Sequence, residues 1–181
     1  MKGMVFTEFL EMVETRFGLQ TVDRIIGQAQ LANDGAYTAV GTYDHQELVQ
    51  LVTALSAATQ VPVPDLIKAF GQHLFGRFAL GYPRLFEGVD SAFAFLRSIE
   101  RYIHVEVRKL YPDAELPSFT YERQGPDDLV MLYQSRRPFA DLAEGLILGC
   151  IEHYGEAIDL RREDLETGAT NRSRFTLTRR S

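Results

Sequence analysis

Residues 132–149, LYQSRRPFADLAEGLILG, join the end of a strand to the start of a helix and indicate how the chain folds. Residues 129–133 form a short apolar run of the kind found in buried strands. From residue 139 to residue 154 the apolar side chains return at helical spacing, with Leu142, Leu146 and Cys150 on one face. A sheet and a helix are therefore expected side by side in the same unit.

The hydrophobic period changes from helical to strand-like along the chain. Before Pro112 apolar residues recur every three or four positions, and after it they alternate or form short runs. We predict helices near residues 5–17, 44–55, 62–78, 89–110 and 139–154, and strands near residues 119–121, 129–133, 158–160 and 175–177. This order predicts an α+β fold, in which a helical N-terminal half packs on a C-terminal antiparallel sheet with an embedded helix.

Local signals mark some element ends. Asp44 followed three residues later by Glu47 is typical of a capping box, so a helix is expected to begin there. Pro62 and Pro64 fit the first turn of the next helix. Residues 124–127 have the composition of a hairpin turn between the first two strands.

Composition narrows the function classes. The 181 residues include 19 Lys and Arg against 25 Asp and Glu, a net charge of -6 that argues against a non-specific nucleic-acid binder. A single cysteine excludes an internal disulfide framework. The first residues do not resemble a signal peptide, and no apolar stretch approaches the ~18–20 residues that span a bilayer. We expect a single cytoplasmic domain over residues 1–181 that contacts no membrane.

Tyr133, Ser135 and Arg137 are the first candidate binding residues. In an extended chain they share one face, which offers two hydroxyls and a guanidinium that matches a carboxylate. Such a row of donors suits a ligand with a pair of carboxylates, such as haem. The alternative is a strand that runs out into a polar turn before the next helix.

His104 is the candidate metal ligand. It lies late in the predicted helix at 89–110, beside the apolar stripe, where a neutral imidazole facing an apolar cavity could hold iron. The alternative is a histidine that is only hydrogen-bonded at the edge of a core. No nucleophile with a nearby base is evident, so an enzyme is not expected.

Several segments together resemble the H-NOX (haem nitric oxide/oxygen binding) family, namely MKGMVFTEFLEMV (1–13), the helix around Phe70 and Gly71, IHVEVRKLYPDAELPSF (103–119) and LYQSRRPFADLAEGLILG (132–149). The resemblance implies haem b between the two halves, with residues 1–60 as a distal helical subregion and residues 61–181 as the part that holds the haem and includes the sheet. It implies that His104 is the proximal iron ligand and that Pro117 bends the porphyrin. Tyr133, Ser135 and Arg137 would bind the propionates. The positions implied to line the distal side are Val5, Phe9, Leu74, Phe78, Leu142 and Leu146.

The resemblance also implies which gas is bound. Family members that hold oxygen place a tyrosine over it, whereas the matching residue here is Leu142, and the supporting positions are Phe9 and Leu74. Without a donor we expect NO and CO to bind ferrous haem and oxygen to be excluded. The alternative is that Tyr37, Tyr43 or Tyr82 reaches the pocket from elsewhere in the chain.

A signalling role follows as a hypothesis from the resemblance. Binding of NO would release His104 from the iron, let the porphyrin relax against Pro117 and rotate the two halves. The partner would be a separate histidine kinase or cyclic-di-GMP enzyme in a bacterium. Two other classes stay open, a module of this fold for another apolar carboxylate ligand, such as a lipid or a bilin, and an interaction module without a cofactor.

Overall fold

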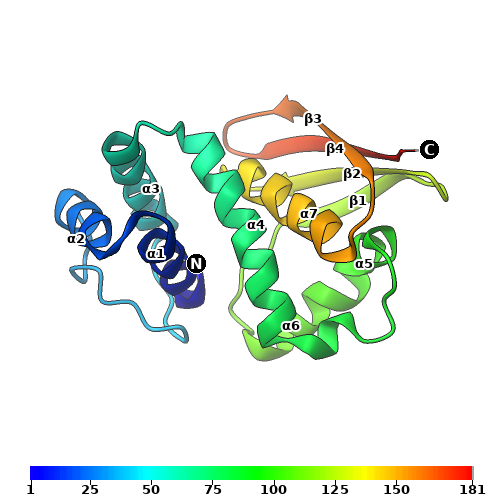
Figure 1. Ribbon diagram of the computed structural model, residues 1–181. Coiled ribbons are helices and arrows are strands. Elements are labelled where there is room, and N and C mark those ends of the chain that lie inside the picture. The colour runs from blue at the N-terminus through cyan, green and yellow to red at the C-terminus, as the bar shows by residue number, and fades with distance from the viewer. Residues whose placement is uncertain (181) are drawn as a thin grey trace.

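The computed structural model describes residues 1–180, with helices in the first half and a sheet in the second (Figure 1). The helices are α1 (Gly3–Phe17), α2 (Leu19–Gln28), α3 (His45–Thr59), α4 (Val63–Gly81), α5 (Ala92–Ser98), α6 (His104–Leu110) and α7 (Ala140–Tyr154), with a 3-10 turn, η1 (Pro83–Phe86), and a π-helical turn, η2 (Ile99–Ile103). The strands are β1 (Ser118–Gln124), β2 (Asp128–Ser135), β3 (Ile158–Glu166) and β4 (Asn171–Arg179). The predicted α+β fold is confirmed. Within residues 1–180 no helix has the length and apolarity needed to cross a membrane.

The first three helices, α1 to α3, form a group at one end of the molecule (Figure 1). Ile25, Leu51 and Leu55 are fully buried in its core. Helix α2 was not predicted, although Val22, Ile25 and Ile26 recur there at helical spacing. Gly18 separates α1 from α2 with φ 85°, a backbone conformation that favours glycine.

Asp44 is the N-cap of α3, as predicted, but the capping box is only half formed. The Asp44 carboxylate accepts the backbone N–H of Gln46 at 2.9 Å. Glu47, which the pattern paired with Asp44, instead accepts the hydroxyl of Tyr37 at 2.6 Å. Glu47 is 8% exposed, so the phenol satisfies a carboxylate that is largely withdrawn from water. A tertiary contact therefore replaces the local one.

Two long helices, α4 and α7, pack against each other through the middle of the molecule (Figure 1). Their close approach depends on glycine, because a Cβ placed on Gly71 of α4 would lie 2.6 Å from the carbonyl oxygen of Leu142 on α7. Gly145 of α7 faces Gly71 and is equally short of room. The glycine in the quoted Phe70-Gly71 segment thus has a packing role.

The sheet is antiparallel with the order β1-β2-β4-β3, and α7 lies in sequence between β2 and β3. Strand β2 is confirmed at the predicted apolar run, but its burial alternates, with Leu129, Met131 and Tyr133 buried. They pack with Phe175 and Leu177 of β4 and with the inner face of α7 in one apolar core. The sheet therefore provides a rigid support for the residues at the end of β2.

The predicted helix at 89–110 runs without a break from residue 92 to residue 110, but it is not α-helical throughout. Ser91 caps its start by accepting the backbone N–H of Ala94 at 3.3 Å, and α5 ends at Ser98. The chain then makes the π-helical turn η2 before α6 begins at His104. π-helical turns are rare and frequently lie at functional sites, and this one directly precedes the candidate ligand.

Candidate functional site

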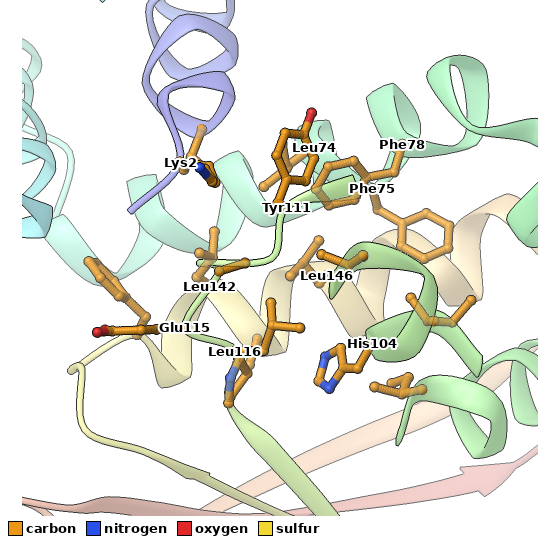
Figure 2. A pocket seen from close by; sticks show the side chains of 18 of the residues that line it. Lys2, Leu74, Phe75, Phe78, His104, Tyr111, Glu115, Leu116, Leu142 and Leu146 are labelled. Carbon is orange, nitrogen blue, oxygen red and sulfur yellow. The ribbon is translucent and has the colours of Figure 1, made fainter. Parts of the chain in front are cut away.

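A cavity of about 440 Å³ lies between the two halves, and its lining is mostly apolar. Its volume falls in the range of small-molecule and cofactor sites, ~300–1,000 Å³. Helices α4 and α7 form one side and η2 and α6 form the other, and the loop at 111–117 also lines the cavity (Figure 2). Ten of the eleven predicted site residues line it, namely Val5, Leu74, Phe78, His104, Pro117, Tyr133, Ser135, Arg137, Leu142 and Leu146.

His104 projects from the start of α6 into this cavity and is 7% exposed (Figure 2). Its Nδ1 lies 3.0 Å from Oε1 of Glu100, one turn earlier. A carboxylate only accepts hydrogen bonds, so Nδ1 is the donor and the lone pair is on Nε2. Within residues 1–180, Nε2 forms no hydrogen bond. Burial lowers the pKa of His104, against the opposing influence of Glu100, and this favours the neutral imidazole that a metal requires.

Glu100 was not predicted, although it organises the candidate ligand. The same Oε1 atom that meets His104 also accepts the backbone N–H of Phe119 at 2.8 Å. One carboxylate therefore joins η2, α6 and the first strand, and it fixes the orientation of the imidazole. The signal available in the sequence was an acidic residue four positions before a histidine, which is common on helices and weak by itself.

Tyr133, Ser135 and Arg137 meet at one end of the cavity, but not by simple alternation along a strand. Strand β2 ends at Ser135, and Arg137 lies in the bend that follows. The bend is held by the backbone N–H of Arg137, which donates to Oγ of Ser135 at 3.0 Å. Tyr133 is 2% exposed, and burial raises the pKa of its phenol, so the hydroxyl stays a neutral donor.

The guanidinium of Arg137 pairs with Glu115 of the loop at 111–117, with 2.5 Å between Nη2 and Oε2. The Glu115 side chain is 77% exposed and its carboxylate lies at the cavity edge (Figure 2). Such exposed pairs contribute only about 0–1 kcal/mol. Glu115 therefore orients Arg137 through a weak contact. The other N–H groups of the guanidinium can bind a second carboxylate.

The side of the cavity formed by α1, α4 and α7 is apolar, as predicted, with one correction. Phe9 does not line the cavity, because it is fully buried among the N-terminal helices with its ring 5.2 Å from that of Phe70. Tyr37 and Tyr43 also lie outside the lining. Tyr82 does reach the lining, and its hydroxyl lies 3.0 Å from that of Tyr111.

A sequence profile described as Haem-NO-binding matches residues 2–162. The chain belongs to the Haem-NO-binding family. Haem is the cofactor of this H-NOX family, and the chain is therefore a haem-binding domain of a gas-sensor family. The cavity fits that cofactor, since it offers an imidazole nitrogen free of hydrogen bonds within residues 1–180, apolar walls and a cation with two hydroxyls at one end.

Solved H-NOX structures are similar over the whole length. The Fe(II) unliganded H-NOX protein from K. algicida is 39% identical with a TM-score of 0.94, and the match covers 100% of this chain and 97% of that one. The H-NOX protein from Shewanella woodyi, solved bound to IWP-051 in the Fe(II)CO state, is 43% identical with a TM-score of 0.84, over 99% of this chain and 95% of that one.

A curated relative is soluble guanylate cyclase 89Db from Drosophila melanogaster. It is 26% identical over 139 residues, which are 76% of this H-NOX chain and 20% of the cyclase. The chain thus spans about a fifth of that protein's length.

Proposed function

We propose that this H-NOX domain senses nitric oxide, and that His104 is its proximal iron ligand. When bound, ferrous haem b supplies a coordination position that takes a diatomic gas. The observation that carries the proposal is the buried imidazole whose Nδ1 is held by Glu100 and whose Nε2 has no hydrogen bond within residues 1–180. A histidine oriented in this way by a carboxylate is the usual arrangement of a metal-binding imidazole.

Tyr133, Ser135 and Arg137 would hold the propionates of the haem. Two hydroxyls and a guanidinium at one end of an otherwise apolar cavity match a cofactor whose only charged groups lie along one edge. Hydrogen bonds to charged groups contribute about 1.5–3 kcal/mol each, more than the exposed pair with Glu115. Arg137 can therefore bind a propionate even where that costs the contact with Glu115.

The apolar side would select the gas. Val5, Leu74, Phe78, Leu142 and Leu146 offer no hydrogen-bond donor to a bound gas. The hydroxyls of Tyr82 and Tyr111, which also line the cavity, are engaged with Met4 and with each other. Stabilisation of bound oxygen needs such a donor, whereas NO and CO bind ferrous haem without one. We infer that the domain binds NO and CO and excludes oxygen.

The signal would begin at His104 and change how residues 1–60 pack on residues 61–181. His104 would hold the iron and Pro117 would lie against the cofactor, so a change in the haem on gas binding would reach η2, α6 and the loop at 111–117. The N-terminal helices contact the same cavity through Val5, so the change would reach them as well. The domain itself would catalyse no reaction in this scheme. A cytoplasmic histidine kinase or cyclic-di-GMP enzyme would read the change as a separate protein.

Titration of the reduced, haem-loaded protein with CO and then with NO tests the proposal. We expect one equivalent of each gas to shift the main haem absorption band. His104→Ala, supplied with the same haem, should lose the spectrum of the histidine-ligated ferrous state. A protein that takes up no haem, or an unchanged spectrum in the variant, would contradict the proposal.

A further inference from the structure

A second hollow lies on the surface next to the cavity and shares a wall with it. This cleft has a volume of about 510 Å³ and is lined by residues of α1, the loop before α3 and the end of α4. Three residues line both the cleft and the cavity and also form a contact chain, Met4, Tyr82 and Tyr111. All three are half-buried, as expected for side chains with one face toward each hollow.

The wall is held by weak, reversible contacts. The hydroxyls of Tyr82 and Tyr111 lie 3.0 Å apart, and the Tyr82 hydroxyl also donates to Sδ of Met4 at 3.9 Å. Burial, followed by the contact with Tyr111, raises the pKa of Tyr82 to about 12, so the hydroxyl that contacts Met4 stays neutral near neutral pH. Separation of these side chains would therefore expose no charge at Tyr82.

The three side chains come from three different elements. Met4 is in the first turn of α1, Tyr82 follows the last residue of α4, and Tyr111 follows the last residue of α6. Lys2 steadies the group, with its ammonium 5.6 Å from the centre of the Tyr111 ring and 2.6 Å from a carboxylate oxygen of Asp113. Small shifts between these helix ends would separate the two hydroxyls.

The position of the wall suggests its role, and this step rests on the proposed function. Haem propionates at Tyr133, Ser135 and Arg137 would close the polar end of the cavity. Tyr111 contacts Tyr82 at the end of α4, and Figure 2 shows it on the side of the cavity away from His104, where the gas would arrive. We propose that Met4, Tyr82 and Tyr111 form a gate through which the diatomic gas passes between the surface cleft and the cavity.

The gate makes a kinetic prediction that differs from a direct effect on bound gas. Opening breaks the bond between the two hydroxyls, and the loss of one such bond raises the open population about threefold to tenfold. Passage inward and passage outward use the same opening. Both rates should therefore rise by the same factor, and the affinity should not change.

Flash photolysis and ligand replacement on the reduced, haem-loaded protein measure the two rates with CO as the probe. Tyr82→Phe and Tyr111→Phe should each raise CO association and dissociation about threefold to tenfold. Ala39→Trp, on the exposed side of the cleft, should slow both rates by covering the gate from outside. Tyr121→Phe is the matched control, because it also loses a half-buried tyrosine hydrogen bond, to the Leu96 carbonyl, but lies outside both hollows.

Unchanged rates in both tyrosine variants would overturn the gate. A change in only one of the two rates, and hence in affinity, would also overturn it, since the hydroxyl would then act on the bound gas. If the unsubstituted protein bound haem but no CO, the proposed function would fail, and the gate would fail with it. That result is distinct from normal CO binding with unaltered rates.

Discussion

The two sides of the cavity are built in different ways. On the side of His104, a chain of directed contacts runs from the imidazole through Glu100 to the backbone of Phe119. On the opposite side, Leu74 and Leu142 offer only apolar surface. The first side fixes the position of the His104 imidazole through hydrogen bonds. Leu74 and Leu142 on the second side offer no hydrogen-bond donor. Under the proposed function, the first side would hold the cofactor and the second would select the gas.

The largest expected effect comes from removing the His104 imidazole, the proposed iron ligand, from the first side. His104→Gly should lose most of its haem during purification, because no other side chain on that side offers an imidazole, and added imidazole should restore the haem content. The ratio of haem absorption to protein concentration measures this. His45→Ala, at the half-buried start of α3 and outside the cavity lining, is the control. Normal haem content in His104→Gly without imidazole would show that His104 is not the iron ligand.

Next in size is the charged end of the cavity. Arg137→Ala should speed haem dissociation about tenfold or more, because a charged hydrogen bond of about 1.5–3 kcal/mol is lost. Transfer of haem to an excess of an acceptor protein gives the rate. Arg136→Ala removes the same charge from the neighbouring exposed position outside the lining and should leave the rate unchanged. Equal rates in the two variants would mean that charge alone, and not position, matters.

The difference between the two sides can also be reduced by adding a donor to the apolar one. The double variant Leu142→Tyr with Leu74→Asn should gain oxygen affinity by about tenfold or more, since a hydrogen bond to a charged acceptor contributes about 1.5–3 kcal/mol. Oxygen titration of the reduced protein measures it. Leu142→Phe with Leu74→Asn has similar bulk without the hydroxyl, and a similar gain there would contradict the account.

The smallest effect concerns how firmly His104 is oriented. Glu100→Gln keeps an acceptor for the Phe119 backbone but removes the charge beside Nδ1, so the imidazole becomes a weaker donor to iron. Resonance Raman spectra should show the iron–histidine stretching band at lower frequency. Glu106→Gln, whose carboxylate pairs with Lys109 instead, should leave the band in place.

The sequence predicts local faces well and long-range contacts poorly. Tyr133, Ser135 and His104 could be selected as candidates from spacing and from the family resemblance, because a strand or helix determines which neighbours share a face. Phe9 was misplaced because spacing cannot say whether an apolar residue lines a cavity or lies one layer behind it. The contact of Arg137 with Glu115 joins residues 22 positions apart, and only the folded loop brings them together.

Exposure of the reduced, haem-loaded protein to oxygen and then to NO tests the central claim most directly. The account predicts that absorption spectra show no oxygen complex in air-saturated buffer, and that NO produces a new spectrum at one equivalent. A stable oxygen complex in the unsubstituted protein would contradict it, because the side of the cavity that faces His104 would then contain a donor that stabilises bound oxygen.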